Sequence, residues 1–252
     1  MALLEIHDLT MKFGSLVAND SVSFSVNKGE IVGLIGPNGA GKTTLFNCVS
    51  GFFPPTEGKV IFNNEDVTGL PTHAIARKGM VRTFQVVHPL KEMSVLDNVL
   101  VGAFLREKDV EKVHEIAWKC LKDCKLDDLA YRLAGDLTIG QKKRLEMARA
   151  LATGPTLLML DEAMAGLTAT EVKEVVELIR RLKEKGLTIL IVEHIMEGIM
   201  PIADKVVVLD GGVKIAEGPP HEIINDERVI KAYFGEKYSK RLKQAEKVKD
   251  DD

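Results

Sequence analysis

The sequence predicts an α/β fold in which a mainly parallel sheet is joined to an antiparallel β layer and an inserted helical subdomain. Three continuous apolar runs, at 31–35, 157–160 and 188–192, have the length and composition of strands that are buried on both faces. Helical stretches alternate with these runs, which is the order that builds a parallel sheet. Between residues 86 and 150 the apolar spacing becomes helical, so we expect the helical subdomain there.

The antiparallel layer is predicted from the N-terminal quarter of the chain. Residues 3–9 and 21–26 favour strands, and in the second of them apolar residues alternate with serines, the period of a half-buried strand. A turn is expected at 11–14, where Phe13 has no partner in the strand pattern. A further short strand is expected at 59–62.

The next elements are a helix over 71–78, a strand over 80–85 and then the helical subdomain. Within the subdomain, Trp118 is the only tryptophan, and we expect it to take part in ordinary helix packing. Cys120 and Cys124 lie four residues apart, on one face if the segment is helical. A metal site would need further ligands that their neighbourhood lacks, so we expect ordinary helix positions.

The C-terminal part of the chain continues the α/β order. We expect a helix at 170–185, a strand at 205–209 that ends in a turn at 210–212, and an amphipathic helix at 220–234. Residues 237–252 are almost all charged and are predicted to be a solvated tail. Contact of a basic tail with lipid is the alternative, and the closing acidic triplet argues against it.

A glycine-rich motif follows the first buried strand. It fits the pattern G-x-x-x-x-G-K-[ST] and stands between an apolar run and the opening of a helix, the context in which such loops bind phosphate. Glycines let several backbone N–H groups converge on one anion, and the helix N-terminus adds its dipole. Lys42 can reach the outer phosphates and the Thr43 hydroxyl can bind Mg²⁺. The nucleotide-binding residues predicted here are Gly36, Pro37, Asn38, Gly39, Ala40, Gly41, Lys42, Thr43 and Thr44.

Polar residues at the ends of other predicted strands complete a candidate active site. Asp161 can hold Mg²⁺, and Glu162 can act as general base, although an acidic pair at a helix N-terminus is the alternative for both. His194 can hydrogen-bond a γ-phosphate, where a lone histidine would more often be structural. Gln85 can bind the metal or orient the attacking water.

Composition excludes several classes of protein. The formal net charge is −3, so there is no basic excess of the kind that nucleic-acid binding needs. Three cysteines make no disulfide framework and suit a reducing compartment. No basic and apolar leader and no apolar run of about 20 residues is present, so we expect a soluble cytoplasmic chain that meets a membrane only through partners.

Over residues 3–235 the chain resembles the ATP-binding subunit of an ABC transporter. The segment Leu137–Gln141 is similar to the signature motif of that family, which implies that Thr138, Gly140 and Gln141 contact nucleotide held by a second subunit. The other matches follow the family's order: Phe13 with the aromatic that stacks on adenine, Gly36–Thr43 with Walker A, Gln85 with the Q-loop, Asp161 and Glu162 with Walker B and the catalytic glutamate, and His194 with the switch histidine.

Within the family the chain resembles the branched-chain amino-acid importer ATPases. The segments that carry this likeness are Gly36–Gly51, Gly79–Gln85, Lys91–Val95 and Ala232–Glu236. Lipopolysaccharide-export and urea-import ATPases share several of these segments and remain alternatives.

Three residues depart from the family pattern. Ile139 replaces the first glycine of the signature motif, and Ala163 stands where a proline usually stiffens the loop after the glutamate. Thr168 stands where the family often has an aspartate, which weakens a coupling role for a carboxylate in that loop.

The resemblance implies an ABC ATP-binding domain at 1–236. It would consist of a RecA-like P-loop core with the antiparallel layer, at 1–85 and 151–236, and a helical subdomain with the signature motif at 86–150. ATP and Mg²⁺ are the implied cofactors. The implied partners are an identical or paralogous second cassette, two membrane permeases at the cytoplasmic face of the inner membrane and, indirectly, a solute-binding protein.

Two other classes of function fit the sequence less well than transport does. A soluble ABC ATPase of DNA repair or translation would usually carry coiled-coil insertions or two cassettes in one chain, and the sequence has neither. A regulatory module without turnover is disfavoured because Glu162 and His194 are both present.

Overall fold

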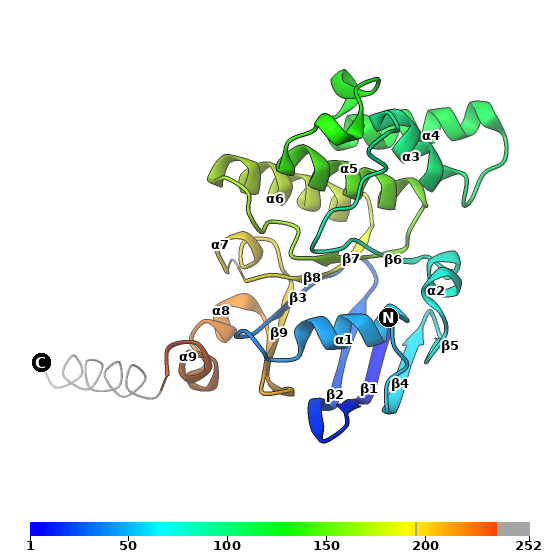
Figure 1. Ribbon diagram of the computed structural model, residues 1–252. Coiled ribbons are helices and arrows are strands. Elements are labelled where there is room, and N and C mark those ends of the chain that lie inside the picture. The colour runs from blue at the N-terminus through cyan, green and yellow to red at the C-terminus, as the bar shows by residue number, and fades with distance from the viewer. Residues whose placement is uncertain (195, 236–252) are drawn as a thin grey trace, which may run out of the picture.

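The computed structural model describes residues 1–194 and 196–235. In this part of the chain a helical layer, a central sheet and an antiparallel sheet lie one below another (Figure 1). The predicted charged tail at 237–252 lies outside the described residues. The layered arrangement confirms the predicted α/β class.

The central sheet has six strands among the described residues, in the order β10-β9-β3-β8-β7-β6. All neighbouring pairs are parallel except β9 and β10, which confirms the expected mainly parallel sheet. Every residue of β3, β7 and β8 is buried, as their continuous apolar runs predict. The strands are β3 (Ile31–Ile35), β6 (Met80–Arg82), β7 (Leu157–Asp161), β8 (Thr188–Val192), β9 (Lys205–Asp210) and β10 (Val213–Gly218).

The second sheet is antiparallel, with the order β2-β1-β4-β5. Its strands are β1 (Ala2–Phe13), β2 (Leu16–Asn27), β4 (Glu57–Phe62) and β5 (Glu65–Asp66). The expected turn at 11–14 is wrong, because Phe13 pairs with Leu16 and so closes a two-residue hairpin. Gly14 has φ 60°, the left-handed conformation that such tight hairpin turns require.

Helix α1 (Lys42–Val49) lies between the two sheets (Figure 1). Its apolar face, including the fully buried Phe46, shares one core with residues of both sheets. This packing fixes the start of the helix, and with it the glycine loop, against the end of β3.

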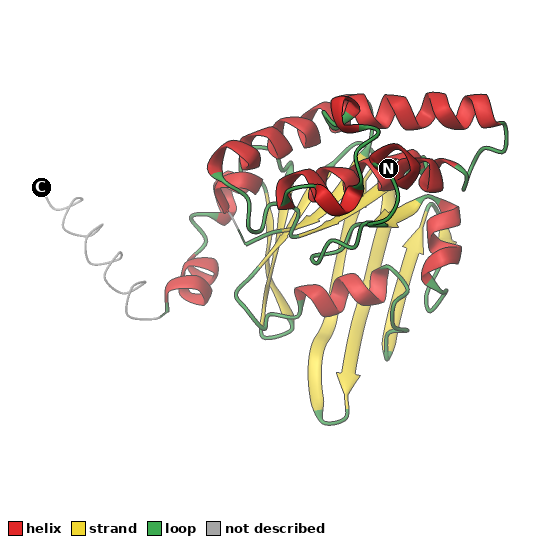
Figure 2. Cartoon of the chain, turned by 45° about the horizontal axis from the view of Figure 1, so that its top comes forward, coloured by secondary structure: helices red, strands yellow, loops and turns green. Residues whose placement is uncertain are grey.

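The opposite face of the central sheet is covered by helices (Figure 2). These are α3 (Val95–Ala103), α4 (Val110–Asp123), α5 (Ile139–Ala152) and α6 (Ala169–Glu184). Shorter elements complete the described chain: α2 (Thr72–Lys78), α7 (Met196–Ile199), α8 (Pro220–Ile223), α9 (Glu227–Phe234), and the 3-10 turns Asp127–Leu129 and Ala134–Asp136.

Several predicted boundaries are wrong for local reasons. The strand predicted at 80–85 ends at Arg82, because the Phe84 N–H bonds the side chain of Glu146 instead of a neighbouring strand. Within the expected helical subdomain the first helix begins at 95, after the N-cap Ser94. The helix expected at 220–234 is two helices, and Asp226 caps the second of them.

The cysteines and the tryptophan occupy ordinary helix-packing positions, as expected. Cys120 and Cys124 are buried free thiols, and burial raises the pKa of Cys120 to about 11. Trp118 packs against the helical core and makes an edge contact with Tyr131, with ring centroids 6.2 Å apart. In the described part of the chain, no helix combines the length and apolar character that a bilayer crossing requires.

Candidate active site

A cavity of about 540 Å³ opens where strands of the central sheet end. Gln85, Glu162 and His194, which lie far apart in the sequence, meet the glycine loop at its wall. The described lining residues are Leu16, Val17, Ala18, Asn38, Gly39, Ala40, Gly41, Lys42, Thr43, Thr44, Gln85, Glu162, His194, Gly211 and Gly212. Asp161 is buried behind this wall, and Phe13 and the signature residues lie outside it.

The glycine loop depends on its glycines at two points. Gly36 has φ 152°, and a Cβ there would lie 2.1 Å from the backbone oxygen of Leu209. Gly41 precedes α1 with φ 92°, so the loop can turn directly into the helix. The ammonium of Lys42 donates to the carbonyls of Gly36 and Pro37 at 2.8 and 2.9 Å, and burial lowers its pKa. A cation and a helix N-terminus therefore stand at one end of the cavity, the arrangement that binds phosphate.

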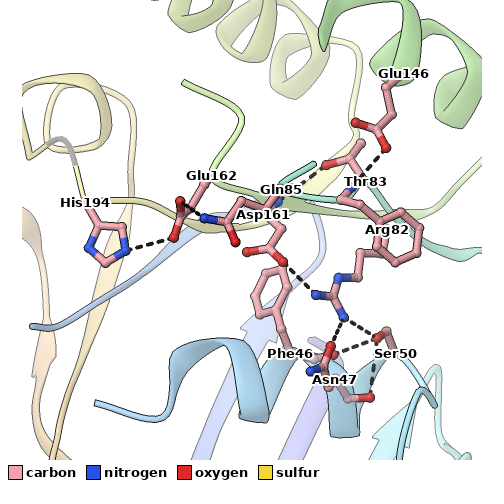
Figure 3. A network of polar contacts seen from close by, with 11 residues as sticks. Phe46, Asn47, Ser50, Arg82, Thr83, Gln85, Glu146, Asp161, Glu162 and His194 are labelled. Carbon is pink, nitrogen blue, oxygen red and sulfur yellow. Dashed lines mark hydrogen bonds and ion pairs between the residues drawn. The ribbon is translucent and has the colours of Figure 1, made fainter. Parts of the chain in front are cut away.

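Glu162 connects the predicted catalytic residues (Figure 3). One of its carboxylate oxygens contacts Nε2 of His194 at 2.8 Å, and the other accepts from Nε2 of Gln85 at 2.6 Å. Glu162 is only 8% exposed, whereas His194 and Gln85 are exposed at the cavity. The side chains that the sequence proposes for catalysis therefore form one hydrogen-bonded group.

Arg82 is a member of the site that the sequence analysis missed (Figure 3). Its guanidinium donates to Asp161 at 2.6 Å, to Asn47 at 2.6 Å and to Ser50 at 3.0 Å. It also lies over the ring of Phe46, with 5.5 Å to the centroid. Arg82 thus ties the helix after the glycine loop to the strand that carries Asp161. A cation inside a short, otherwise apolar strand was the signal that could have revealed it.

The oxygen donors near the cavity suit a hard cation. Oδ1 of Asp161 is buried and has no hydrogen-bond partner among the described residues, so it can accept from a metal-bound water. The Thr43 hydroxyl and the Gln85 amide line the cavity itself. Among described residues no cluster of three His, Cys, Asp or Glu could hold a metal alone. These few protein oxygens match Mg²⁺, which usually keeps waters and substrate phosphates in its shell.

The signature segment forms the start of α5. Thr138 caps the helix in a capping box. Its hydroxyl accepts from the backbone N–H of Gln141, and the side-chain oxygen of Gln141 accepts from the backbone N–H of Thr138. The helix therefore begins at 139, inside the signature segment. Ile139 is 62% exposed, so most of its side chain faces solvent. A Cβ on Gly140 would lie 2.2 Å from Oε1 of Glu171.

Thr168, the departure in the neighbouring loop, has a local structural role. It caps α6 and forms a capping box with Glu171. The spacing Thr-x-x-Glu ahead of a helix was the sequence signal for this cap. Since Glu171 also touches Gly140, the loop and the signature segment are in contact within one chain.

Comparison with known protein families identifies the chain. The family model described as ABC transporter matches residues 19–165, more than half of the sequence. The chain belongs to the ABC transporter family. A second model, described as branched-chain amino acid ATP-binding cassette transporter, matches residues 213–239.

Relatives of this ABC cassette are similar over nearly their whole length. The high-affinity branched-chain amino acid transport ATP-binding protein BraF of Pseudomonas aeruginosa is 42% identical, over 93% of this chain and 98% of the relative. The corresponding protein LivG of Escherichia coli K12 is 41% identical over the same shares of both chains. The cassette is therefore an ATPase coupled to transport.

Solved structures agree with this assignment. An ATP-binding cassette of an ABC transporter in its ADP conformation is 37% identical, with a TM-score of 0.85 over 94% of this chain and 100% of that one. A bacterial ABC transporter cassette solved as a dimer is 25% identical, with a TM-score of 0.77 over 86% of this chain and 98% of that one. The predicted P-loop ATPase fold is confirmed.

Phe13 of the cassette is 45% exposed. The sequence analysis finds no partner for it, whereas the structure gives it an aromatic neighbour. Its ring meets that of Phe53 edge-on, with 5.9 Å between centroids. Leu16 and Val17, just across the hairpin, line the cavity. Stacking of Phe13 on adenine stays a prediction.

Replacing Phe13 with alanine is expected to weaken ATP binding by about 0.5–1.5 kcal/mol, the range for one aromatic contact. Calorimetric titration of ATP gives the dissociation constant. Phe13→Tyr is the control and should bind ATP nearly as the wild type does. If the alanine variant keeps its ATP affinity and loses only thermal stability, Phe13 serves the contact with Phe53 and not the base.

Glu193, the residue before His194, is buried beside the active site and accepts a hydrogen bond from the Met164 N–H at 2.8 Å. Burial raises the pKa of Glu193 to about 7. The folded protein therefore holds the proton of Glu193 more tightly than the unfolded chain does. The resulting contribution to the free energy of unfolding is complete at pH values below 4.5 and is lost as the pH rises through about 7.

The wild type is expected to lose stability between pH 5 and pH 8, on the order of 3 kcal/mol from this group alone. Glu193→Gln keeps the acceptor for Met164 and cannot ionise. It should match the wild type near pH 5 and be the more stable protein at pH 8. Urea unfolding of both proteins at the two pH values measures this, and identical pH slopes would exclude ionisation of Glu193 as the cause.

Proposed function

We propose that this cassette powers the uptake of branched-chain amino acids as the ATP-hydrolysing subunit of an ABC importer. The observation that carries the choice of solute is the similarity to BraF and LivG over nearly the whole chain, together with the family match at residues 213–239. Lipopolysaccharide export and urea import are the alternative functions, and the experiment below separates leucine uptake from urea uptake.

In the proposed reaction ATP lies on the glycine loop, with Lys42 and the N-terminus of α1 at its phosphates. Glu162 takes a proton from the attacking water, and His194 and Gln85, which contact the two oxygens of Glu162, hold that carboxylate toward the cavity. Thr43, Gln85 and Asp161 would hold Mg²⁺, whose charge offsets that of the phosphates.

The proposed assembly contains two cassettes, identical or paralogous, bound to two membrane permeases at the cytoplasmic face of the membrane. Thr138, Gly140 and Gln141 of one cassette would then contact nucleotide held by the other. The dimeric cassette among the solved relatives supports this pairing. A solute-binding protein would deliver the amino acid from the other side, and no nucleic acid takes part.

The test is uptake by proteoliposomes that contain the cassette and the permeases encoded beside its gene. Labelled leucine should enter in the presence of ATP and the matching binding protein, and it should fail to enter with Glu162→Gln in place of the wild type. Labelled urea serves as the competing solute. ATP-driven urea uptake without leucine uptake would replace the proposed solute, and movement of neither would reject both.

A further inference from the structure

The backbone of Glu162 has an unusual conformation. Its φ is 48°, in the left-handed region that residues with a side chain rarely adopt. Such a conformation is strained and persists only where the surroundings hold it. Other groups must therefore fix the loop.

Lys143 makes a hydrogen bond that can fix the backbone of this loop. It lies on α5, is 7% exposed, and its ammonium donates to the backbone carbonyl of Glu162 at 2.6 Å. Within the described chain Lys143 makes no ion pair at 4.0 Å or less, and the carbonyl of Glu162 accepts the hydrogen bond of this buried cation. Burial lowers the pKa of Lys143, while the nearby carboxylates of Glu193 and Glu146 oppose that change.

The same loop is held from its other side. Oε1 of Glu193 accepts from the N–H of Met164, two residues after Glu162. The N–H of Glu162 itself donates to Val192 at 3.0 Å. The elements β8 and α5 thus hold the loop between them, and the contact from α5 is made by Lys143.

We propose that Lys143 is a positioning residue, which fixes the backbone of Glu162 so that its carboxylate faces the attacking water. The inference rests on the proposed role of Glu162 as general base. Because Lys143 stands two residues beyond the signature segment on the same helix, a shift of that segment also moves the contact to Glu162. Lys143 therefore links the segment that would touch one nucleotide to the base that would act on the other.

Lys143→Met is the test, because methionine keeps the length of the side chain and removes the donor. The rate at saturating ATP should fall about 10- to 100-fold, as expected when a reacting group is misplaced by about 1 Å. The dissociation constant of ATP should stay within about twofold, since Lys143 does not line the cavity. Lys143→Leu, which is shorter and likewise has no donor, serves the same purpose if the methionine variant does not fold.

Lys142→Met is the matched control. Lys142 is the preceding residue on α5 and donates to the carbonyl of Gly135 at 2.9 Å, away from Glu162. Its loss should leave the rate within about twofold, because no group at the reacting atoms changes. Equal losses in the two variants would mean that α5 merely needs its lysines for packing, and would overturn the proposal.

A double-mutant comparison separates positioning from other effects. In the Glu162→Gln background the added change Lys143→Met should have no further effect on the residual rate, because the group that it positions is already lost. A full additional loss in that background, or an unchanged rate in Lys143→Met alone, would refute the role. If Glu162→Gln itself keeps its rate, the proposed base is wrong, and that outcome is distinct from failure of Lys143.

Discussion

Glu162→Gln is expected to lower ATP hydrolysis by about 10²–10⁴-fold, the usual contribution of a general base. Glutamine fills the same space and can still contact His194 and Gln85, so the cavity and the glycine loop should remain intact. ATP binding should therefore be retained. The measurements are the rate of phosphate release at saturating ATP and the dissociation constant of ATP.

The change His194→Ala provides the companion measurement. The imidazole contacts Oε1 of Glu162 at 2.8 Å, so its removal should slow hydrolysis while the base itself remains. The two changes together should cost less than the sum of their separate effects, since the groups act as one unit. Turnover near that of the wild type in Glu162→Gln would refute Glu162 as the base.

The central sheet and the residues at its strand ends were predictable because their signals are local. The strand predicted at 188–192 matches β8, since five consecutive apolar or β-branched residues leave little choice of structure. His194 and Glu162 could then be placed together, because parallel strands present their carboxyl ends at one edge. The glycine loop was fixed by its own motif and flanking elements.

The residues that were missed act over long distances in the sequence. Arg82 pairs with Asp161, and Lys143 bonds the carbonyl of Glu162, yet neither pairing leaves a mark in the local pattern. Which buried cation meets which carboxylate or carbonyl depends on how the helical layer packs on the sheet. From the sequence alone, only the presence of a charged residue beside apolar ones could be noticed, and not the group that it contacts.

Element boundaries failed where a cap or turn outweighs an apolar pattern. The amphipathic spacing continues through 220–234, but the side chain of Asp226 accepts from the Arg228 N–H and starts a new helix. At the N-terminus, strand β1 continues to Phe13 because the hairpin needs only Gly14 and Ser15 to reverse the chain. Both signals were present in the sequence as turn and cap residues.

Glu162→Gln is also expected to trap a dimer of cassettes in the presence of ATP and Mg²⁺. Each chain carries a formal charge of −3, so long-range attraction between two copies is not the source of pairing. Bound triphosphate would supply the adhesion, through charge-assisted hydrogen bonds from the glycine loop of one copy and the signature segment of the other. When hydrolysis is blocked, that link should persist.

Adding Gly140→Asp to Glu162→Gln should abolish the dimer, because a carboxylate would then stand where the signature segment meets the γ-phosphate. The structure demands a control, since a Cβ at this position lies 2.2 Å from Oε1 of Glu171 in the same chain. Glu171→Gln removes the like charge and keeps the capping box with Thr168. Gly140→Ala brings the same Cβ beside Glu171 without a carboxylate. In the Glu162→Gln background each of these changes should leave the dimer intact, and Glu171→Gln combined with Gly140→Asp should not restore pairing.

Light scattering of these variants across a concentration series, with saturating ATP and Mg²⁺, gives the oligomeric state directly. If Glu171→Gln restores the dimer in the Gly140→Asp background, the aspartate acts by repelling Glu171 within one subunit, and the contact with the partner's nucleotide is refuted. If Glu162→Gln stays monomeric, this cassette does not pair with itself. A paralogous cassette is then the natural partner. The same experiment repeated with that second chain should give a mixed dimer, because the half-site made by Thr138 and Gly140 needs nucleotide held by a second cassette.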